Sequence, residues 1–89
     1  MNVITYQRAI KVFSILNGRI GEKDKLILYY DEHDDRITAG YSYSELASLN
    51  DRIVIPKNII ANMTEGIFNL YVYKLKEKVK LNKIKEDFE

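Results

Sequence analysis

The chain has a single proline, Pro56, which constrains local structure more than any other residue. It follows a short apolar run, Arg52 to Ile55, and the residue before a proline is driven towards extended geometry. Proline also suits the first turn of a helix, because its fixed φ fits there and its missing N–H would be unpaired anyway. We therefore predict a strand over residues 52–55 and a short helix that starts at Pro56.

The first part of the chain predicts a short extended start, a helix and a β-hairpin. Residues 2–6 favour extended structure. Apolar residues then recur at spacings of three and four, which predicts a helix over residues 6–16 with Thr5 as its cap. Two β-type runs, 25–30 and 36–41, flank five polar residues and predict a hairpin. The turn of this hairpin is the acidic segment Asp31-Glu32-His33-Asp34-Asp35.

A capping signal follows the hairpin. Ser42-Tyr43-Ser44-Glu45 has the spacing of a capping box, in which a serine caps a helix and a glutamate three residues on reaches back. We therefore expect one or two helical turns over residues 46–49, which Asn50 and Asp51 then end.

The segment after the Pro56 helix predicts a second hairpin. Residues 64–66 favour a turn, and residues 67–75 are rich in the β-branched and aromatic side chains that favour strands. Apolar and lysine residues then alternate, so the turn would lie near Glu77 and a return strand would span 79–84. One face of this hairpin would be apolar, and the other would carry Lys74, Lys76, Lys78 and Lys80.

One long helix is the alternative for this segment, because Val72, Leu75 and Val79 also stand at helical spacing. We favour the hairpin on the strength of the β-type composition. The predicted fold is therefore a small, strand-rich α+β domain with two β-hairpins and two or three short helices. Residues 2–38 and 51–84 would then each run strand, helix, hairpin, which indicates a weak internal repeat.

Length and composition place the chain among small globular domains. With 89 residues, 46% of them hydrophobic and 30% charged, it forms one domain with a limited core. Small cores of this kind are often completed by dimerisation, so we expect a homodimer. The chain has no cysteine, no bilayer-length apolar run and no signal-peptide pattern. We therefore expect a cytoplasmic protein without a membrane partner.

The sequence contains no recognisable catalytic or metal-binding pattern. The single histidine, His33, stands among acids that lack calcium-loop spacing, which favours a solvated turn over a metal site. The serines stand apart from any histidine–aspartate pair, and the four glycines do not form a phosphate-binding loop. We predict that the protein is not an enzyme and uses no metal, cofactor or small-molecule substrate.

The stretch Arg52-Ile53-Val54-Ile55-Pro56-Lys57, with Met63 seven residues after the proline, resembles the AbrB/MazE-like swapped-hairpin family of DNA-binding regulators and antitoxins. The similarity covers residues 50–84, and residues 21–31 look like the latter part of the same domain type. The resemblance implies a strand, a short helix and paired strands. It also implies a two-fold dimer of interleaved hairpins and DNA contact in the major groove.

The leading functional prediction is therefore a DNA-binding transcriptional regulator. Arg52 matches a DNA-contacting arginine of that family, whereas Ile60 and Ala61 replace two arginines that some members carry. The predicted lysine face would neutralise phosphates, although lysines also protect exposed edge strands from aggregation. The predicted DNA-binding residues are Arg52, Lys57, Lys74, Lys76, Lys78 and Lys80.

A protein-interaction module is the second prediction, since the net charge is only +1 and arginines are few. A small phage- or virus-type accessory protein, or an antitoxin-like inhibitor, would bind a protein partner. Tyrosines are enriched at interfaces, and the acidic turn would meet a basic surface. The predicted partner-binding residues are Asp31, Glu32, Asp34, Asp35, Tyr71 and Tyr73.

Overall fold

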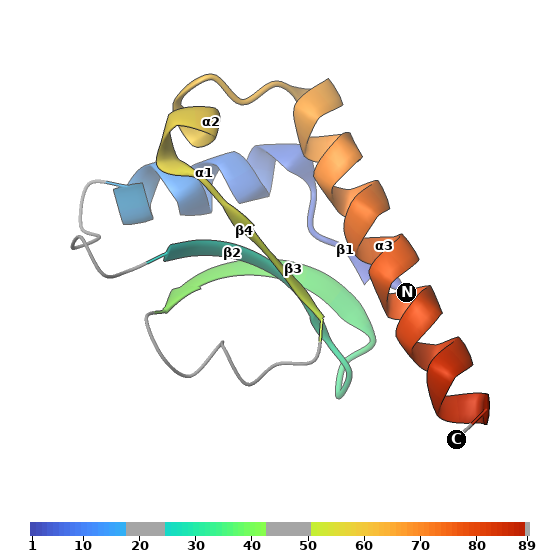
Figure 1. Ribbon diagram of the computed structural model, residues 1–89. Helices are drawn as coiled ribbons and strands as arrows, with labels where there is room; N and C mark the ends of the chain where they lie inside the picture. Colours follow the sequence, from blue (N-terminus) through green and yellow to red (C-terminus); the bar gives the residue numbers. More distant parts are fainter. Residues whose placement is uncertain (18–24, 43–50, 89) are drawn as a thin grey trace.

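The computed structural model of the protein describes residues 1–17, 25–42 and 51–88. Within these residues the chain forms an α+β domain, in which helices pack against a four-stranded sheet (Figure 1). The elements in chain order are β1 (Asn2–Val3), α1 (Tyr6–Asn17), β2 (Lys25–Asp31), β3 (Arg36–Ser42), β4 (Arg52–Ile55), α2 (Lys57–Ala61) and α3 (Glu65–Phe88).

The sheet has the strand order β1-β3-β2-β4 and mixes parallel with antiparallel pairs. β2 and β3 form the hairpin around the acidic turn, with Lys25 opposite Ser42 and Asp31 opposite Arg36. β4 pairs antiparallel with the other side of β2, and β1 pairs parallel with β3. The strand before Pro56 therefore lies at one edge of the described sheet, beside the buried strand β2.

The helices cover one face of this sheet. Leu26, Leu28 and Tyr30 alternate along β2 and point to this face, as the period of a strand requires. α3 closes the core with four buried residues at spacings of four, three and four, which share one side of a helix. These are Phe68, Val72, Leu75 and Val79, and they join Ala9, Phe13, Ile37, Ile55 and Ile60 in one cluster.

The structure confirms the predicted elements of the first half and the strand at the proline. At the start of α1 the backbone N–H of Arg8 donates to Oγ1 of Thr5 (3.3 Å), so Thr5 is the cap. The predicted hairpin strands form β2 and β3, and β4 has the predicted bounds. Pro56 has an extended ψ of 144° and precedes α2 as its N-cap residue. Ser42 ends β3, and the rest of the expected capping box and its helix lie outside the described residues.

The second hairpin predicted for residues 67–84 is wrong, because this segment belongs to the single helix α3. The predicted turn is instead the helix start, where Oγ1 of Thr64 accepts a hydrogen bond from the backbone N–H of Ile67 (3.2 Å). Lysine, leucine and glutamate fill the second half of the segment and have high helix propensity. A helix also buries one row of side chains without needing a partner strand. The alternative of one long helix is therefore correct.

Because residues 65–88 form one helix, the predicted internal repeat and the predicted paired strands after Pro56 are also absent from the described residues. The first segment, residues 2–38, does run strand, helix, hairpin, but the segment 51–84 runs strand, helix, helix, so the expected repeat is not formed. The paired strands that the family resemblance implies after the Pro56 helix are likewise replaced by α3.

Candidate interaction surface on helix α3

The side of α3 that faces away from the sheet carries a row of exposed apolar side chains. Leu70, Tyr73, Leu81 and Ile84 are 52%, 61%, 57% and 43% exposed. With Glu77 they follow spacings of three, four, four and three, which places all five in one line along a helix. We call these five residues the outer stripe. Scattered exposed apolar residues are common, but an aligned row on a helix is typical of a surface that meets a partner.

Exposed lysines flank the outer stripe on both sides. At 100° per residue, Lys74 and Lys78 lie on one side of it, and Lys76, Lys80 and Lys83 lie on the other. The single basic face predicted for the first four lysines of this segment is therefore wrong, because the helix separates Lys74 and Lys78 from Lys76 and Lys80.

Lys78, a member of the first group of lysines, lies at the junction between α3 and β4. Nζ of Lys78 donates to the backbone oxygen of Arg52 (3.0 Å). Beside it, the side-chain amide of Asn82 donates to the carboxylate of Asp51, which is only 3% exposed. The backbone oxygen of Asp51 in turn accepts from the N–H of Tyr30 (2.9 Å). These bonds fix the C-terminal half of α3 against the sheet and hold its outer stripe towards solvent.

The two residues predicted to contact DNA at the strand–helix corner are not neighbours. Arg52 is half-buried at the first position of β4, next to Lys78. Lys57 is exposed at the start of α2, beyond the other end of β4. An extended strand rises about 3.3 Å per residue. The length of β4 therefore separates Lys57 from Arg52 and Lys78.

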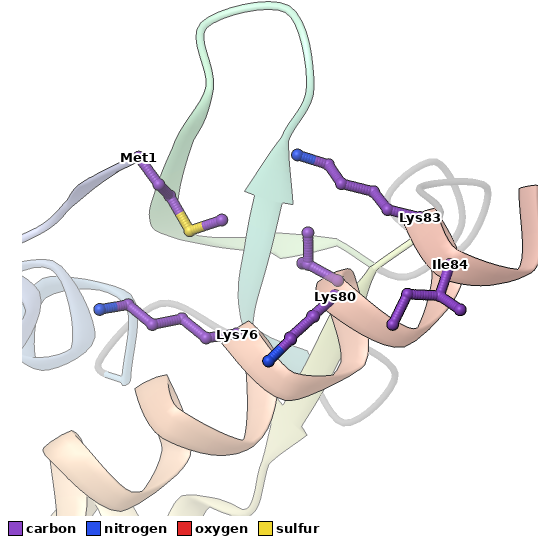
Figure 2. Close-up of a pocket in the computed structure, with 6 residues that line it drawn as sticks. Met1, Lys76, Lys80, Lys83 and Ile84 are labelled. Atoms are coloured by element: carbon purple, nitrogen blue, oxygen red, sulfur yellow. The ribbon is translucent and has the colours of Figure 1, made fainter. Parts of the chain in front are cut away.

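The second group of lysines surrounds a pocket between α3 and the N-terminus. Lys76, Lys80 and Lys83 line it together with Met1, Val79 and Ile84, and its volume is about 300 Å³. Figure 2 shows the lysine side chains extending from α3 around the pocket, with the side chain of Met1 approaching from the opposite wall. We call it the lysine pocket. Ile84 belongs both to this pocket and to the outer stripe, so the two features are continuous.

A hydrogen-bonded pair contacts two residues of the lysine pocket, Lys83 and Met1. The ammonium group of Lys83 lies 5.5 Å from the ring centre of Tyr30, whose hydroxyl donates to Oδ1 of Asp35 (2.5 Å). The other carboxylate oxygen of Asp35 lies 3.4 Å from the N-terminal amine of Met1. The hydrogen bond from Tyr30 holds the pKa of Asp35 below its ordinary value, and the N-terminal amine lowers this pKa further. The same bond raises the pKa of Tyr30 to about 12.

Two further carboxylates of the acidic turn, those of Asp31 and Asp34, have partners within the turn or beside it. Oδ1 of Asp31 accepts from the backbone N–H groups of His33 (3.0 Å) and Asp34 (3.4 Å). The guanidinium of Arg36 reaches both Asp31 (4.0 Å) and Asp34 (3.5 Å). These contacts organise the turn, and a basic partner would have to compete with Arg36 for the carboxylates of Asp31 and Asp34.

Of the tyrosines predicted to bind a partner, only one lies on the outer stripe. Tyr73 is the most exposed of the large apolar side chains among the described residues. Tyr71 is half-buried and packs against the core, with the ammonium of Lys74 5.7 Å from its ring centre. The structure therefore separates these two tyrosines into one surface residue and one packing residue.

The titration of Tyr30 gives a first test of this site. Its ordinary pKa is 10.0, and a neutral hydroxyl is needed to donate to Asp35. The hydrogen bond from Tyr30 to Asp35 therefore stabilises the folded protein below pH 10, and this stabilisation is lost as the pH rises through about 12. In an absorbance titration of phenolate, the wild type should show a transition near pH 12 that Tyr30→Phe lacks. Asp35→Ala should move that transition back towards 10.0, and superimposable wild-type and Asp35→Ala curves would contradict the assignment.

Sequence reasoning missed Leu70, Glu77, Leu81 and Ile84 as surface residues. Their spacing was readable as a helical line, but the period-two interpretation placed Leu81 on the buried face. Met1 and Lys83 were also missed as pocket residues, because they stand at opposite ends of the chain and no local pattern joins them.

Comparisons with protein-family models, curated proteins and solved structures found no match to this chain. Among the described residues, no group of histidine, aspartate and glutamate side chains comes together in a way that could hold a metal ion. None of the described helices combines the length and the apolar character needed to cross a membrane.

Proposed function

We propose that this protein is a non-catalytic interaction module that binds a protein partner through the outer stripe of α3. The observation that supports this proposal is the line of four large apolar side chains, each 43–61% exposed, on a helix whose opposite side is anchored in the core. Complete burial of one such side chain contributes about 1.5–3 kcal/mol. Burial of the exposed halves of all four would contribute about 3–6 kcal/mol, before the costs of association.

DNA binding is the second candidate function, and the lysines favour it. They flank α3 on both sides, and Arg52 lies beside Lys78. Two features of the outer stripe favour a protein partner over DNA. Phosphates would meet the carboxylate of Glu77 in the middle of the stripe, and they would cover leucine side chains without any gain from apolar contact.

Photo-crosslinking from the outer stripe is the experiment that tests the proposed function. A photoreactive phenylalanine analogue replaces Tyr73 in one variant and the exposed Gln7 of α1 in another, and both are expressed in cells of the source organism. We expect position 73, but not position 7, to capture a specific protein, which mass spectrometry identifies. The identified protein is then purified and its affinity for this chain measured.

The affinity measurement decides whether the captured protein binds at the outer stripe. Leu81→Asp should weaken binding at least about tenfold, which corresponds to 1.4 kcal/mol, because binding would bury an unpaired charge. Gln7→Asp adds the same charge on α1 and should leave the affinity unchanged. Equal binding by wild type and Leu81→Asp would refute the proposal. Steeply salt-dependent binding to duplex DNA that Arg52→Ala weakens and Leu81→Asp does not would favour the second candidate.

A further inference from the structure

We infer that the partner presents an acidic amphipathic helix. Its apolar row would lie on the outer stripe, its carboxylates would meet the flanking lysines and the lysine pocket, and a basic side chain would face Glu77. This inference rests on the proposed function and adds the chemistry of the partner to it. The shape of the outer stripe, the charges beside it and the lysine pocket support this inference.

The shape of the outer stripe fits a helix. It extends from Leu70 to Ile84, a rise of about 21 Å along α3 at 1.5 Å per residue. Its side chains step along the axis by three or four residues, the same spacing that an amphipathic helix presents on its own apolar side. A strand places the side chains of one face about 7 Å apart, which does not match these shorter steps.

The charges of this surface require an acidic partner. Five exposed lysines flank the outer stripe, whereas Glu77 supplies its one acidic group. An acidic helix places carboxylates along both flanks, where each exposed ion pair adds modestly to the affinity. Glu77 lies between apolar neighbours, so a partner that covers it without a basic group would bury an unpaired carboxylate.

A second copy of this chain would not supply the carboxylates that the lysine flanks need or the basic group that Glu77 needs. The outer stripe is symmetric about Glu77, so an antiparallel copy would place Leu70 opposite Ile84 and Glu77 opposite Glu77. Lysine flanks would then face lysine flanks, and like charges directly opposite one another are destabilising. A surface of anionic lipid would match the lysines but would bring its own negative charge against Glu77.

The lysine pocket can bind an acidic side chain of the partner at one end of this surface. Its three lysines have no ion pair with a carboxylate within the described residues. The apolar part of its lining is formed by Val79 and Ile84 of α3 and by Met1. A glutamate of the partner would pack its methylene groups on this apolar part and place its carboxylate among the ammonium groups.

Three synthetic helical peptides of about 21 residues test the inference directly, since this length permits partial helix formation. The first has leucines along one line, a lysine at the centre of that line and glutamates on both flanks. The second replaces the central lysine with glutamate, and the third replaces the flanking glutamates with lysines. Fluorescence anisotropy gives each affinity. We expect the first peptide to bind, the second to bind about fivefold more weakly and the third not to bind.

Variants of the protein show which of its residues determine the order of the peptide affinities. Glu77→Lys should reverse the order of the first two peptides. The double variant Lys80→Ala/Lys83→Ala should weaken binding of the first peptide by about threefold or more, whereas Lys57→Ala, which removes an exposed lysine from α2, should leave it unchanged.

Two results would overturn the inference. One is equal binding of the acidic and basic peptides. The other is no peptide binding while vesicles of phosphatidylserine bind in a manner that Leu81→Asp abolishes. If none of the peptides binds but Leu81→Asp still weakens binding of the captured partner, the partner does not present an acidic amphipathic helix. The proposed function then stands. If Leu81→Asp has no effect on the captured partner either, the proposed function itself fails.

Discussion

Leu75→Ala should lower the free energy of unfolding by about 2–5 kcal/mol, whereas Leu81→Ala should change it by less than about 0.5 kcal/mol. Leu75 is completely buried against the sheet, and Leu81 is 57% exposed on the outer stripe. Both substitutions remove the same atoms from the same helix, so their effects on helix propensity are equal and cancel in the comparison. The difference between the two variants therefore measures burial alone.

Urea denaturation followed by circular dichroism provides these free energies. The midpoint of Leu75→Ala should shift strongly at an unchanged slope, while Leu81→Ala should superimpose on the wild type. If residues 67–84 formed the predicted hairpin instead, positions 75 and 81 would share its buried face. Both substitutions would then lower the free energy of unfolding. Comparable losses in the two variants would therefore contradict the helix α3 and the outer stripe together.

The same pair of residues explains why the sequence predicted the first half of the chain better than the second. In α1 the apolar spacing and the cap at Thr5 agree with one period only, and the two strands of the hairpin flank an unmistakable polar turn. In residues 67–84 both periods fit, and Leu75 and Val79 are buried in either of them. Tyr73 and Leu81 distinguish the two structures because they are exposed in the helix, and Phe68 and Val72 do so because they are buried in it. Which of these residues is buried depends on packing against a distant sheet.

The candidate site was harder to predict than the fold for a related reason. Arg52 and Lys57 flank the proline in sequence and suggested one binding corner, but an extended strand holds them apart. Met1 and Lys83 line one pocket because the fold brings the N-terminal residue next to α3. Local patterns specify strands, helices and turns, whereas the joining of surface groups depends on tertiary packing that no short window contains.

Glu77→Leu should convert the protein into a species that associates with itself. A leucine at position 77 would join Leu70, Tyr73, Leu81 and Ile84 into an uninterrupted apolar row, and two antiparallel copies would bury it. The wild type should not pair through this surface, because its two Glu77 carboxylates would face each other with little water around them. Like-charged lysine flanks would still oppose pairing, so association should strengthen at about 0.5 M NaCl, where charges are screened over a few ångström.

Light scattering across a range of protein concentrations measures this change as a rise in mean mass. Glu77→Gln is the matched control, because it removes the charge but keeps a polar side chain at the centre of the stripe. It should associate much less than Glu77→Leu. A wild type that already pairs through this face, with crosslinks between the α3 helices of two copies, would contradict the argument. In that case the acidic group at the centre of the stripe would not prevent self-pairing, and the surface would be a dimer interface rather than a site for an acidic partner.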